Sequence, residues 1–370
     1  MYRIILILSI TLFTAPLIAD QAADKADFKR LYTEFNDLFA NSKELAPIIE
    51  VAQKLYILAP IAYGNNHMNS AVVTYNLASL YDEKGAELKN ADEQKAFQLY
   101  LEYFAILKEL EVPQDQNYLE QYIAMVKAEY NANTFRSDKK YARTAIKLAK
   151  KLEMSDLELA NLHYLIGNFC YKNSNVNDAK KLFQQAQTYY QNALGAEDYK
   201  VAEMNFYIAR IDLSKDRHKA AEKSFLKVIE ILDDKQDDNA KAMVLISHTS
   251  LVRLYSEIGE VDNATPHCIA YAMKSPANIN RRRIPLFEDK PKFPNFLKRK
   301  NIGAEASVVV EYDVDANGFT TNITIHEAHN EKIKKAAIKA IKKYRYAPII
   351  RDGKPAGIQG FQMTFSYRRI

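Results

Sequence analysis

Small and large side chains recur at a regular interval through most of the chain. From residue 24 to about 274 the apolar positions follow a helical period, with almost no strand-like alternation. A small residue, a large residue four positions later and a small or apolar residue three positions further form a motif. The motif begins at Ala96, Ala142, Ala179, Ala221 and Ala264. It predicts a series of helical hairpins, in which each motif marks a second helix.

A partner helix is expected ahead of these motifs, for example at Leu77-Ala78, Ile166-Gly167, Ile208-Ala209 and Leu251-Val252. Small residues let two antiparallel helices approach closely, and large residues fill the space toward the next pair. Residues 24–58 have the same period and are expected to form one more hairpin at the start of the array.

The repeating residues resemble tetratricopeptide (TPR) repeats. The third unit fits best, because Gly167, Ala179, Phe183 and Ala186 stand at the relative positions of the family. The motifs are 37 to 46 residues apart, longer than the usual spacing of about 34, and the leading Trp and closing Pro are absent. The resemblance implies a TPR-like solenoid over residues 24–275. Its Tyr-rich groove is a candidate peptide site, although tyrosines also fill gaps between helices.

A change of period marks a second domain. Residues 276–284 are expected to be a linker, because this stretch begins with Pro276 and includes three consecutive Arg. Apolar and polar residues then alternate over 306–314 and again over 319–325. The turn residues Asp315 to Gly318 lie between the two runs, so residues 306–326 are expected to form a β-hairpin.

A helix and a final strand complete this domain. Asn330 can cap a helix whose apolar stripe includes Ile333, Ala337 and Ile341. Residues 361–367 alternate again and predict a last strand. The expected fold class is therefore an all-α TPR-like helical solenoid followed by a small α+β domain at 285–370. That domain is a three-stranded antiparallel sheet with a helix, the smallest arrangement that buries one face.

Charge is distributed unevenly between the two parts. Residues 277–370 hold 19 Lys and Arg against 9 Asp and Glu, whereas the rest holds 32 against 37. A basic domain on an acidic body indicates an anionic contact surface. Its cations include Lys335, Lys339, Lys342 and Lys343. Acidic peptides, cell-wall polymer and anionic lipid headgroups are candidates, and nucleic acid is not expected for an exported chain.

The N-terminus is typical of an exported protein. A short positive start precedes a 16-residue apolar run, Ile4 to Ala19, which contains Pro16. This pattern predicts a signal peptide over residues 1–19, cut after Ala19. A retained membrane anchor is the alternative, although a spanning helix needs about 20 apolar residues. The two cysteines, Cys170 and Cys268, lie about four helices apart in the repeat register. They are expected to be buried and free rather than paired.

Reaction chemistry is not indicated by any residue pattern. The sequence has no evident Ser/His/Asp set, phosphate-binding Gly-rich loop or metal triad, so an enzyme is not expected. Asp313 to Gly318 resembles the start of a calcium loop, but Thr324 stands where a bidentate Glu is needed. His326 and His329 have no evident third ligand. We therefore expect neither a metal nor a cofactor.

Three short motifs, in this order, resemble the C-terminal domain of the TonB energy transducers of Gram-negative bacteria. They are Phe293-Pro294, Tyr344-Arg345-Tyr346-Ala347-Pro348 and Asp352-Gly353-Lys354-Pro355. The resemblance covers about residues 285–370 and is weakest at 300–306, where the usual Gly-x-Val is Ala304-Glu305-Ala306.

This resemblance implies that the domain binds a "TonB box" peptide of an outer-membrane receptor as an added strand. Main-chain hydrogen bonds then give affinity, and alternate side chains give selectivity. The strand-binding residues would be Phe361, Gln362, Met363, Thr364, Phe365, Ser366 and Tyr367. Phe293 and Pro294 would lie close to the receptor.

The chain departs from a standard transducer, since a retained N-terminal helix and a long Pro-rich spacer are not evident. The first hypothesis is therefore a non-enzymatic periplasmic adaptor. It would bind TonB-dependent outer-membrane receptors while the repeats dock on a TonB–ExbB–ExbD-type complex. The alternatives are a peptidoglycan-binding envelope scaffold and a transducer anchored in the inner membrane by an uncleaved N-terminal helix.

Overall fold

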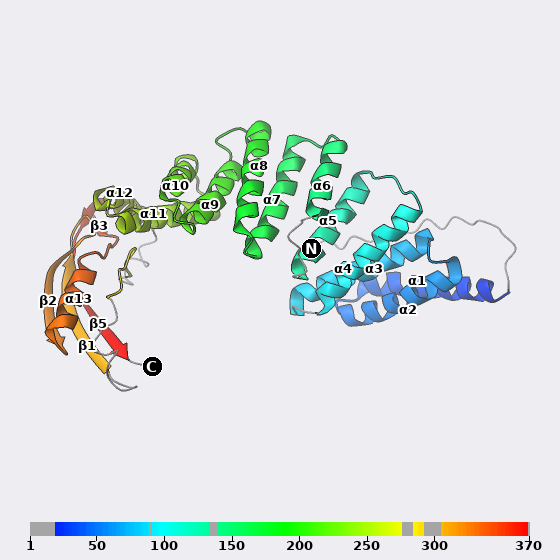
Figure 1. The fold of residues 1–370 in the computed structure, drawn as a ribbon, viewed down its shortest axis with the longest axis horizontal. Helices are drawn as coiled ribbons and strands as arrows, with labels where there is room; N and C mark the ends of the chain where they lie inside the picture. Colours follow the sequence, from blue (N-terminus) through cyan, green and yellow to red (C-terminus); the bar gives the residue numbers. More distant parts are fainter. Residues whose placement is uncertain (1–18, 89–90, 133–139, 276–283, 292–304, 369–370) are drawn as a thin grey trace. The chain divides into compact units, whose positions relative to one another are not determined.

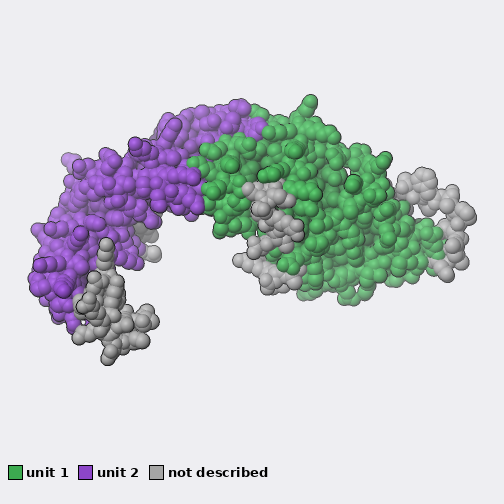
Figure 2. Space-filling model, viewed as in Figure 1, with its two compact units in different colours: residues 1–186 green, residues 187–370 purple. Residues whose placement is uncertain are grey.

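The structure is a computed structural model that describes residues 19–88, 91–132, 140–275, 284–291 and 305–368. The chain divides into two compact units, residues 1–186 and 187–370 (Figure 2). The signal peptide expected at residues 1–19 lies almost wholly outside the described residues. The same is true of most of the expected linker at 276–284 and of Phe293 and Pro294.

Antiparallel helices build unit 1 (Figure 1). In chain order they are α1 Ala19–Asn41, α2 Leu45–Tyr63, α3 Met68–Leu88, α4 Ala91–Glu109, α5 Gln116–Asn131, α6 Lys140–Lys151 and α7 Asp156–Lys172. Helix α8 (Val176–Leu194) begins in unit 1 and continues into unit 2. Each consecutive pair from α1 to α7 packs together, and α7 approaches α8 at Gly167 and Phe183. The predicted array of helical hairpins is confirmed.

The repeated small residues lie where second helices pack. Ala96, Ala142 and Ala179 are all at most 3% exposed, in α4, α6 and α8. Gly167 of α7 lies directly against Phe183 of α8. A Cβ atom added there would lie 2.8 Å from a ring carbon of Phe183. The spacing of small residues in the sequence therefore reports how closely α7 and α8 approach.

Helix α2 is the one helix among the described residues that is long and apolar enough to cross a membrane. Length and composition alone give it this property. Its apolar residues Ile48, Leu55 and Ala59 are buried, and α2 packs against α1 and α3.

Unit 2 continues with four more helices and then the sheet. The helices are α9 Tyr199–Leu213, α10 His218–Leu232, α11 Asp238–Ile258 and α12 Val261–Lys274. Helix α11 ends at Gly259, whose φ of 84° is left-handed and favours glycine. The motif residues Ala221 and Ala264 are fully buried. Cys170 in unit 1 and Cys268 in α12 are both buried, and neither forms a disulfide, as predicted.

A three-stranded antiparallel sheet forms the C-terminal domain. Its elements are β1 Glu305–Val314, β2 Thr320–Ala328, α13 Glu331–Ile341, β3 Ile349–Arg351, β4 Lys354–Ala356 and β5 Ile358–Arg368. The strand order is β2-β1-β5, and β3 and β4 make a separate small hairpin. The predicted sheet and helix are confirmed. The sequence patterns did not reveal β3 and β4, although they did mark the turn at Asp352-Gly353 between them.

The turn between β1 and β2 uses its own carboxylate. Asp315 Oδ1 accepts hydrogen bonds from the N–H groups of Asn317 and Phe319, each at 2.9 Å. Gly318 has a φ of 81°, and a Cβ atom there would lie 2.1 Å from the carbonyl oxygen of Tyr346. The segment that resembled a calcium loop is thus a tight turn between strands, pressed against the Tyr346 backbone.

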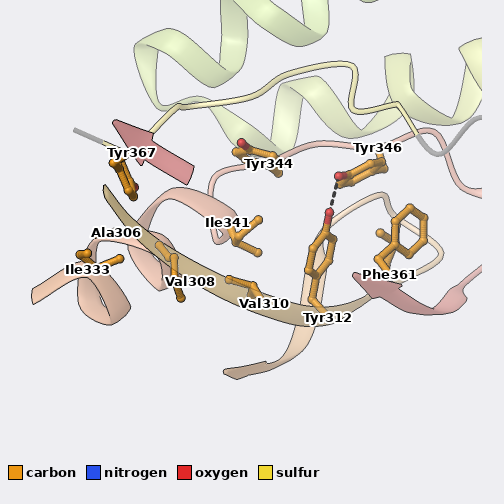
Figure 3. Close-up of a cluster of buried hydrophobic side chains, with 12 residues drawn as sticks. Ala306, Val308, Val310, Tyr312, Ile333, Ile341, Tyr344, Tyr346, Phe361 and Tyr367 are labelled. Atoms are coloured by element: carbon orange, nitrogen blue, oxygen red, sulfur yellow. Dashed lines mark hydrogen bonds between the residues drawn. The ribbon is translucent and has the colours of Figure 1, made fainter. Parts of the chain in front are cut away.

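One face of the sheet carries the core of this domain (Figure 3). The buried side chains are Ala306, Val308, Val310, Tyr312, Val314, Ile333, Ala337, Ile341, Tyr344, Tyr346, Phe361 and Tyr367. They come from β1, β5, α13 and the segment after α13. Asn330 caps α13 as predicted, since its side-chain oxygen accepts the N–H groups of Lys332 and Ile333.

Candidate strand-binding edge and its anchor

Strand β5 lies at a border of the sheet. It pairs with β1 from Glu305 opposite Arg368 to Tyr312 opposite Phe361. On its other side, no strand among the described residues pairs with it. In an antiparallel strand, every second residue directs its N–H and C=O away from the partner. A strand at such a border can pair with a further strand through its outward backbone donors and acceptors.

Side chains of the seven predicted strand-binding residues alternate between the two faces of the sheet. Phe361 and Tyr367 are buried, and Met363 and Phe365 pack partly against the same core. The residues between them, Gln362, Thr364 and Ser366, are exposed. The aromatic side chains thus anchor β5 to its own domain, and the exposed polar side chains are the ones that an added strand would meet on the open face.

A bulge shifts the register near the start of β5. The pairing moves from Tyr312–Phe361 to Val314–Ile358, so two residues of β5 stand opposite Asp313. Asp313 Oδ1 accepts the Gly360 N–H at 2.9 Å, and Gly360 has a left-handed φ of 72°. Asp313 Oδ2 accepts Asn322 Nδ2 at 2.8 Å. The bond from Asn322, followed by that from Gly360, lowers the pKa of Asp313.

Tyrosine hydroxyl groups meet beneath this edge. The Tyr312 and Tyr346 oxygens are 2.6 Å apart (Figure 3), and the Tyr312 ring stacks on Phe361 with centroids 5.5 Å apart. Burial raises the pKa of Tyr312, and burial together with the Tyr312 hydroxyl raises that of Tyr346. Both phenols therefore stay neutral and share a hydrogen bond within the core.

Arg345 is the feature that sequence reasoning missed. It appeared there only as the centre of an aromatic-Arg-aromatic motif, yet its side chain is 1% exposed. Nη1 donates to the Val261 carbonyl of α12 at 3.0 Å. Nη2 donates to Thr265 Oγ1 and to the Asn317 carbonyl, both at 2.9 Å. One guanidinium thus joins helix α12 to the turn between β1 and β2.

The surroundings of Arg345 contain rings and neutral acceptors. Its guanidinium carbon lies 3.6 Å from the centroid of the Phe319 ring. Its backbone N–H donates to the Phe287 carbonyl at 3.0 Å. Within the described ranges, no Asp or Glu forms an ion pair with it. A buried cation held this way depends on every one of its acceptors, because the desolvated charge is costly to leave unpaired.

The predicted basic surface is present on α13 and after it. Lys335, Lys339, Lys342 and Lys343 are all exposed. Lys343 Nζ forms an ion pair with Asp289 at 2.5 Å. The other three form no ion pair with any described residue. On the polar face of the sheet, His326 Nε2 lies 2.7 Å from Glu311, and the described residues include no group of three or more His, Cys, Asp or Glu suited to a metal.

Comparisons with known proteins agree with both family resemblances found in the sequence. Residues 289–368 match the family described as Gram-negative bacterial TonB protein C-terminal. Residues 158–234 match the tetratricopeptide repeat family. These families are interaction domains without catalysis, and together they fit a TonB-type role in protein interaction at the cell envelope. No curated protein matches the chain significantly.

Several solved structures resemble the chain at low identity. One is a structure of the TPR-like repeats of a kinesin light chain from Podosopora anserina. It shares 12% sequence identity with this chain, has a TM-score of 0.43, and the match covers 60% of this chain and 99% of that one. BtubC from P. vanneervenii is 16% identical, with a TM-score of 0.42, covering 64% and 87%. Aspartyl phosphate phosphatase F from Bacillus subtilis is 12% identical, with a TM-score of 0.44, covering 70% and 77%.

Proposed function

We propose that this protein is a non-enzymatic periplasmic adaptor of TonB-dependent outer-membrane transport. The C-terminal domain binds an extended receptor segment along β5 by strand addition, and the helical repeats dock on a partner in a TonB–ExbB–ExbD-type complex. The observation that carries the proposal is the position of β5, which has β1 on one side and no described strand on the other. The match to the TonB C-terminal family supports an outer-membrane receptor as the partner.

Crosslinking from the two edges of the sheet tests this proposal. A photo-crosslinking residue at Thr364 of β5 is expected to yield adducts with outer-membrane receptors in cells that express the protein. The matched control is Thr324, which is exposed on β2 at the opposite border. Receptor adducts that are absent at Thr364, or equally abundant at Thr324, contradict the assignment of β5 as the binding edge.

Proline substitution separates backbone pairing from side-chain contact. Met363 and Thr364 are consecutive, so their N–H groups point to opposite sides of β5. Proline removes the N–H group. One variant, Met363→Pro or Thr364→Pro, is expected to lose the β1 pairing and unfold the domain. The other is expected to keep the fold and lose receptor-peptide binding in an anisotropy titration. A folded proline variant that binds normally contradicts strand addition.

The basic surface supports a second candidate, an envelope scaffold that binds peptidoglycan. Lys335, Lys339 and Lys342 are exposed and unpaired among the described residues, so they can meet an anionic polymer. Cosedimentation with purified cell wall at increasing salt separates this function from the first. Mass spectrometry of the mature N-terminus decides whether the protein is instead an anchored transducer, because cleavage after Ala19 excludes the anchor.

A further inference from the structure

A groove of about 390 Å³ in unit 1 lies between α6 and α8, with α7 beneath it. Three apolar side chains, one from each helix, contribute to its lining: Ile146, Ile166 and Leu182. Ile166 is buried, whereas Ile146 and Leu182 are half-buried. The groove can therefore bury one or two apolar side chains of a partner.

Cations surround this apolar lining. Arg143 and Lys147 come from α6, Lys181 comes from α8, and all three are exposed. None of them forms an ion pair with a described residue. The sequence of α6 explains this, because its 12 residues include five Lys and Arg and no Asp or Glu. No acidic residue thus stands at the i±3 or i±4 positions within α6 that would neutralise a cation on the same helix.

The equivalent groove between α2 and α4 shows that this charge is not a property of the repeat. That groove is larger, about 860 Å³, and α3 contributes to it as α7 does to the other. Its polar lining includes the amides Gln53, Gln94 and Gln98, and its two charged residues, Lys95 and Glu102, have opposite signs. The same architecture thus has a charge-balanced lining in one place and an excess of unpaired cations in another. The cations of α6 and α8 are therefore a specific feature, set in a chain whose other residues up to 276 are acidic on balance.

From this geometry we infer that the groove between α6 and α8 binds an acidic segment of a partner protein. Carboxylates of that segment pair with Arg143, Lys147 and Lys181, and an apolar side chain between them packs on Ile146 and Leu182. The inference deepens the proposed function, because it assigns the surface by which the repeats dock. It rests on the proposed function only for where the partner is found, namely in the periplasm as part of the TonB-type complex.

A peptide fits the lining better than a flat anionic membrane does. The apolar residues lie in a groove between two helices. A single side chain can enter this groove, whereas a flat layer of lipid headgroups cannot reach into it. Asp178 also lines the groove, so the lining is not uniformly cationic. A peptide can place a donor group beside Asp178 and carboxylates beside the cations.

The test uses the full-length protein and a defined probe. The probe is a fluorescein-labelled synthetic peptide in which glutamates flank a central leucine, titrated by fluorescence anisotropy. The double variant Arg143→Glu/Lys147→Glu is expected to weaken binding by about tenfold or more, since two favourable charge pairs become repulsive. Lys181→Glu tests α8 separately. The matched control Lys215→Glu/Lys219→Glu makes the same charge change at exposed positions in unit 2 and is expected to leave binding within about twofold.

Circular dichroism of each variant verifies that the helices are intact before binding is compared. Replacing the leucine of the probe with serine is expected to weaken binding, which tests the apolar lining. Equal loss in the control variant overturns the inference, because it shows dependence on net charge alone. So does peptide binding that is absent while vesicles containing phosphatidylglycerol bind through Arg143 and Lys147. The β5 crosslinks do not depend on this groove, so failure here leaves the strand-binding proposal to its own test.

Discussion

The helical hairpins of unit 1 and the C-terminal domain of unit 2 are held to their neighbouring helices by different kinds of contact. In unit 1 the contact is spread over many small residues, such as Ala96, Ala142 and Gly167, and none of them carries a charge. In unit 2 one buried cation, Arg345, provides the hydrogen bonds that join the sheet domain to helix α12. Distributed packing tolerates single changes, whereas concentrated packing does not. The predictions below test this contrast, beginning with the largest effect.

Arg345→Ala is expected to cost about 3–5 kcal/mol of unfolding free energy in unit 2. The change removes a buried cation together with its hydrogen bonds to three oxygen acceptors and its contact with the Phe319 ring. Urea unfolding and hydrogen exchange of α12 and β1 measure the loss. Arg351→Ala, at an exposed position in β3, is the matched control and is expected to change stability by less than about 0.5 kcal/mol. Similar exchange in both variants would show that Arg345 is not an anchor.

A polar contact inside the last hairpin should make stability depend on pH. The Nδ1 atoms of His248 and His267 are 2.9 Å apart, so one donates to the other. Burial, then electrostatic repulsion from His267 in its protonated form, lowers the pKa of His248 to about 4. Asp233 opposes this shift and Lys274 adds to it. The unfolded chain binds a proton first, near pH 6.5. Stability is therefore complete above pH 6.5 and is lost as the pH falls toward 4.

The expected loss is about 2–3 kcal/mol at pH 4, measured as the difference between wild type and His248→Leu in urea unfolding at several pH values. The difference reports on the His248–His267 pair, because burial also lowers the pKa of His267. The lowered pKa of His163 is common to both proteins. Parallel pH curves for the two proteins would remove His248 as a source of acid sensitivity.

Gly167→Val is expected to destabilise unit 1 by about 1–3 kcal/mol through overpacking. The first added carbon already meets the Phe183 ring at 2.8 Å. Lys172→Val introduces the same side chain at an exposed position of the same helix, so it controls for helix propensity. Thermal unfolding followed by circular dichroism compares the two. The contrast between the regions fails if Gly167→Val is as damaging as Arg345→Ala.

Asn330→Ala should have the smallest effect, about 1 kcal/mol, because it removes only the cap of α13. Asn330→Asp retains an acceptor at the same position and is expected to retain most of the stability. Urea unfolding of the three proteins measures the difference. If the Asp and Ala variants lose the same amount, the side-chain oxygen does not stabilise this helix.

Helices and strands with a regular spacing of apolar residues could be predicted from the sequence. The spacing from Ala179 to Phe183 and Ala186 identifies a packed helix because each position faces the same neighbour at every turn. Alternation over residues 361–367 likewise identifies a strand. The edge position of β5 followed from the family resemblance, since alternation alone does not say which strands are neighbours.

The attachment of the two regions of unit 2 could not be predicted in this way. Arg345 contacts Val261 and Thr265, which lie 84 and 80 positions earlier. No periodic pattern encodes a pair so distant, and a buried arginine is rare enough that an exposed cation was the natural expectation. The same limit applies to the groove between α6 and α8, where residues from three helices converge. One signal was present, since α6 contains five basic residues and no acidic one.

The location of β5 has a mechanical consequence. If a ligand strand pairs with β5 as proposed, it lies parallel to the axis along which its own chain would be pulled. Tension in that direction slides the two strands past each other, so all the interstrand hydrogen bonds share the load. Tension across the sheet would instead peel them apart one after another. The same contacts can therefore resist a strong pull from one direction and yield to a weak pull from another.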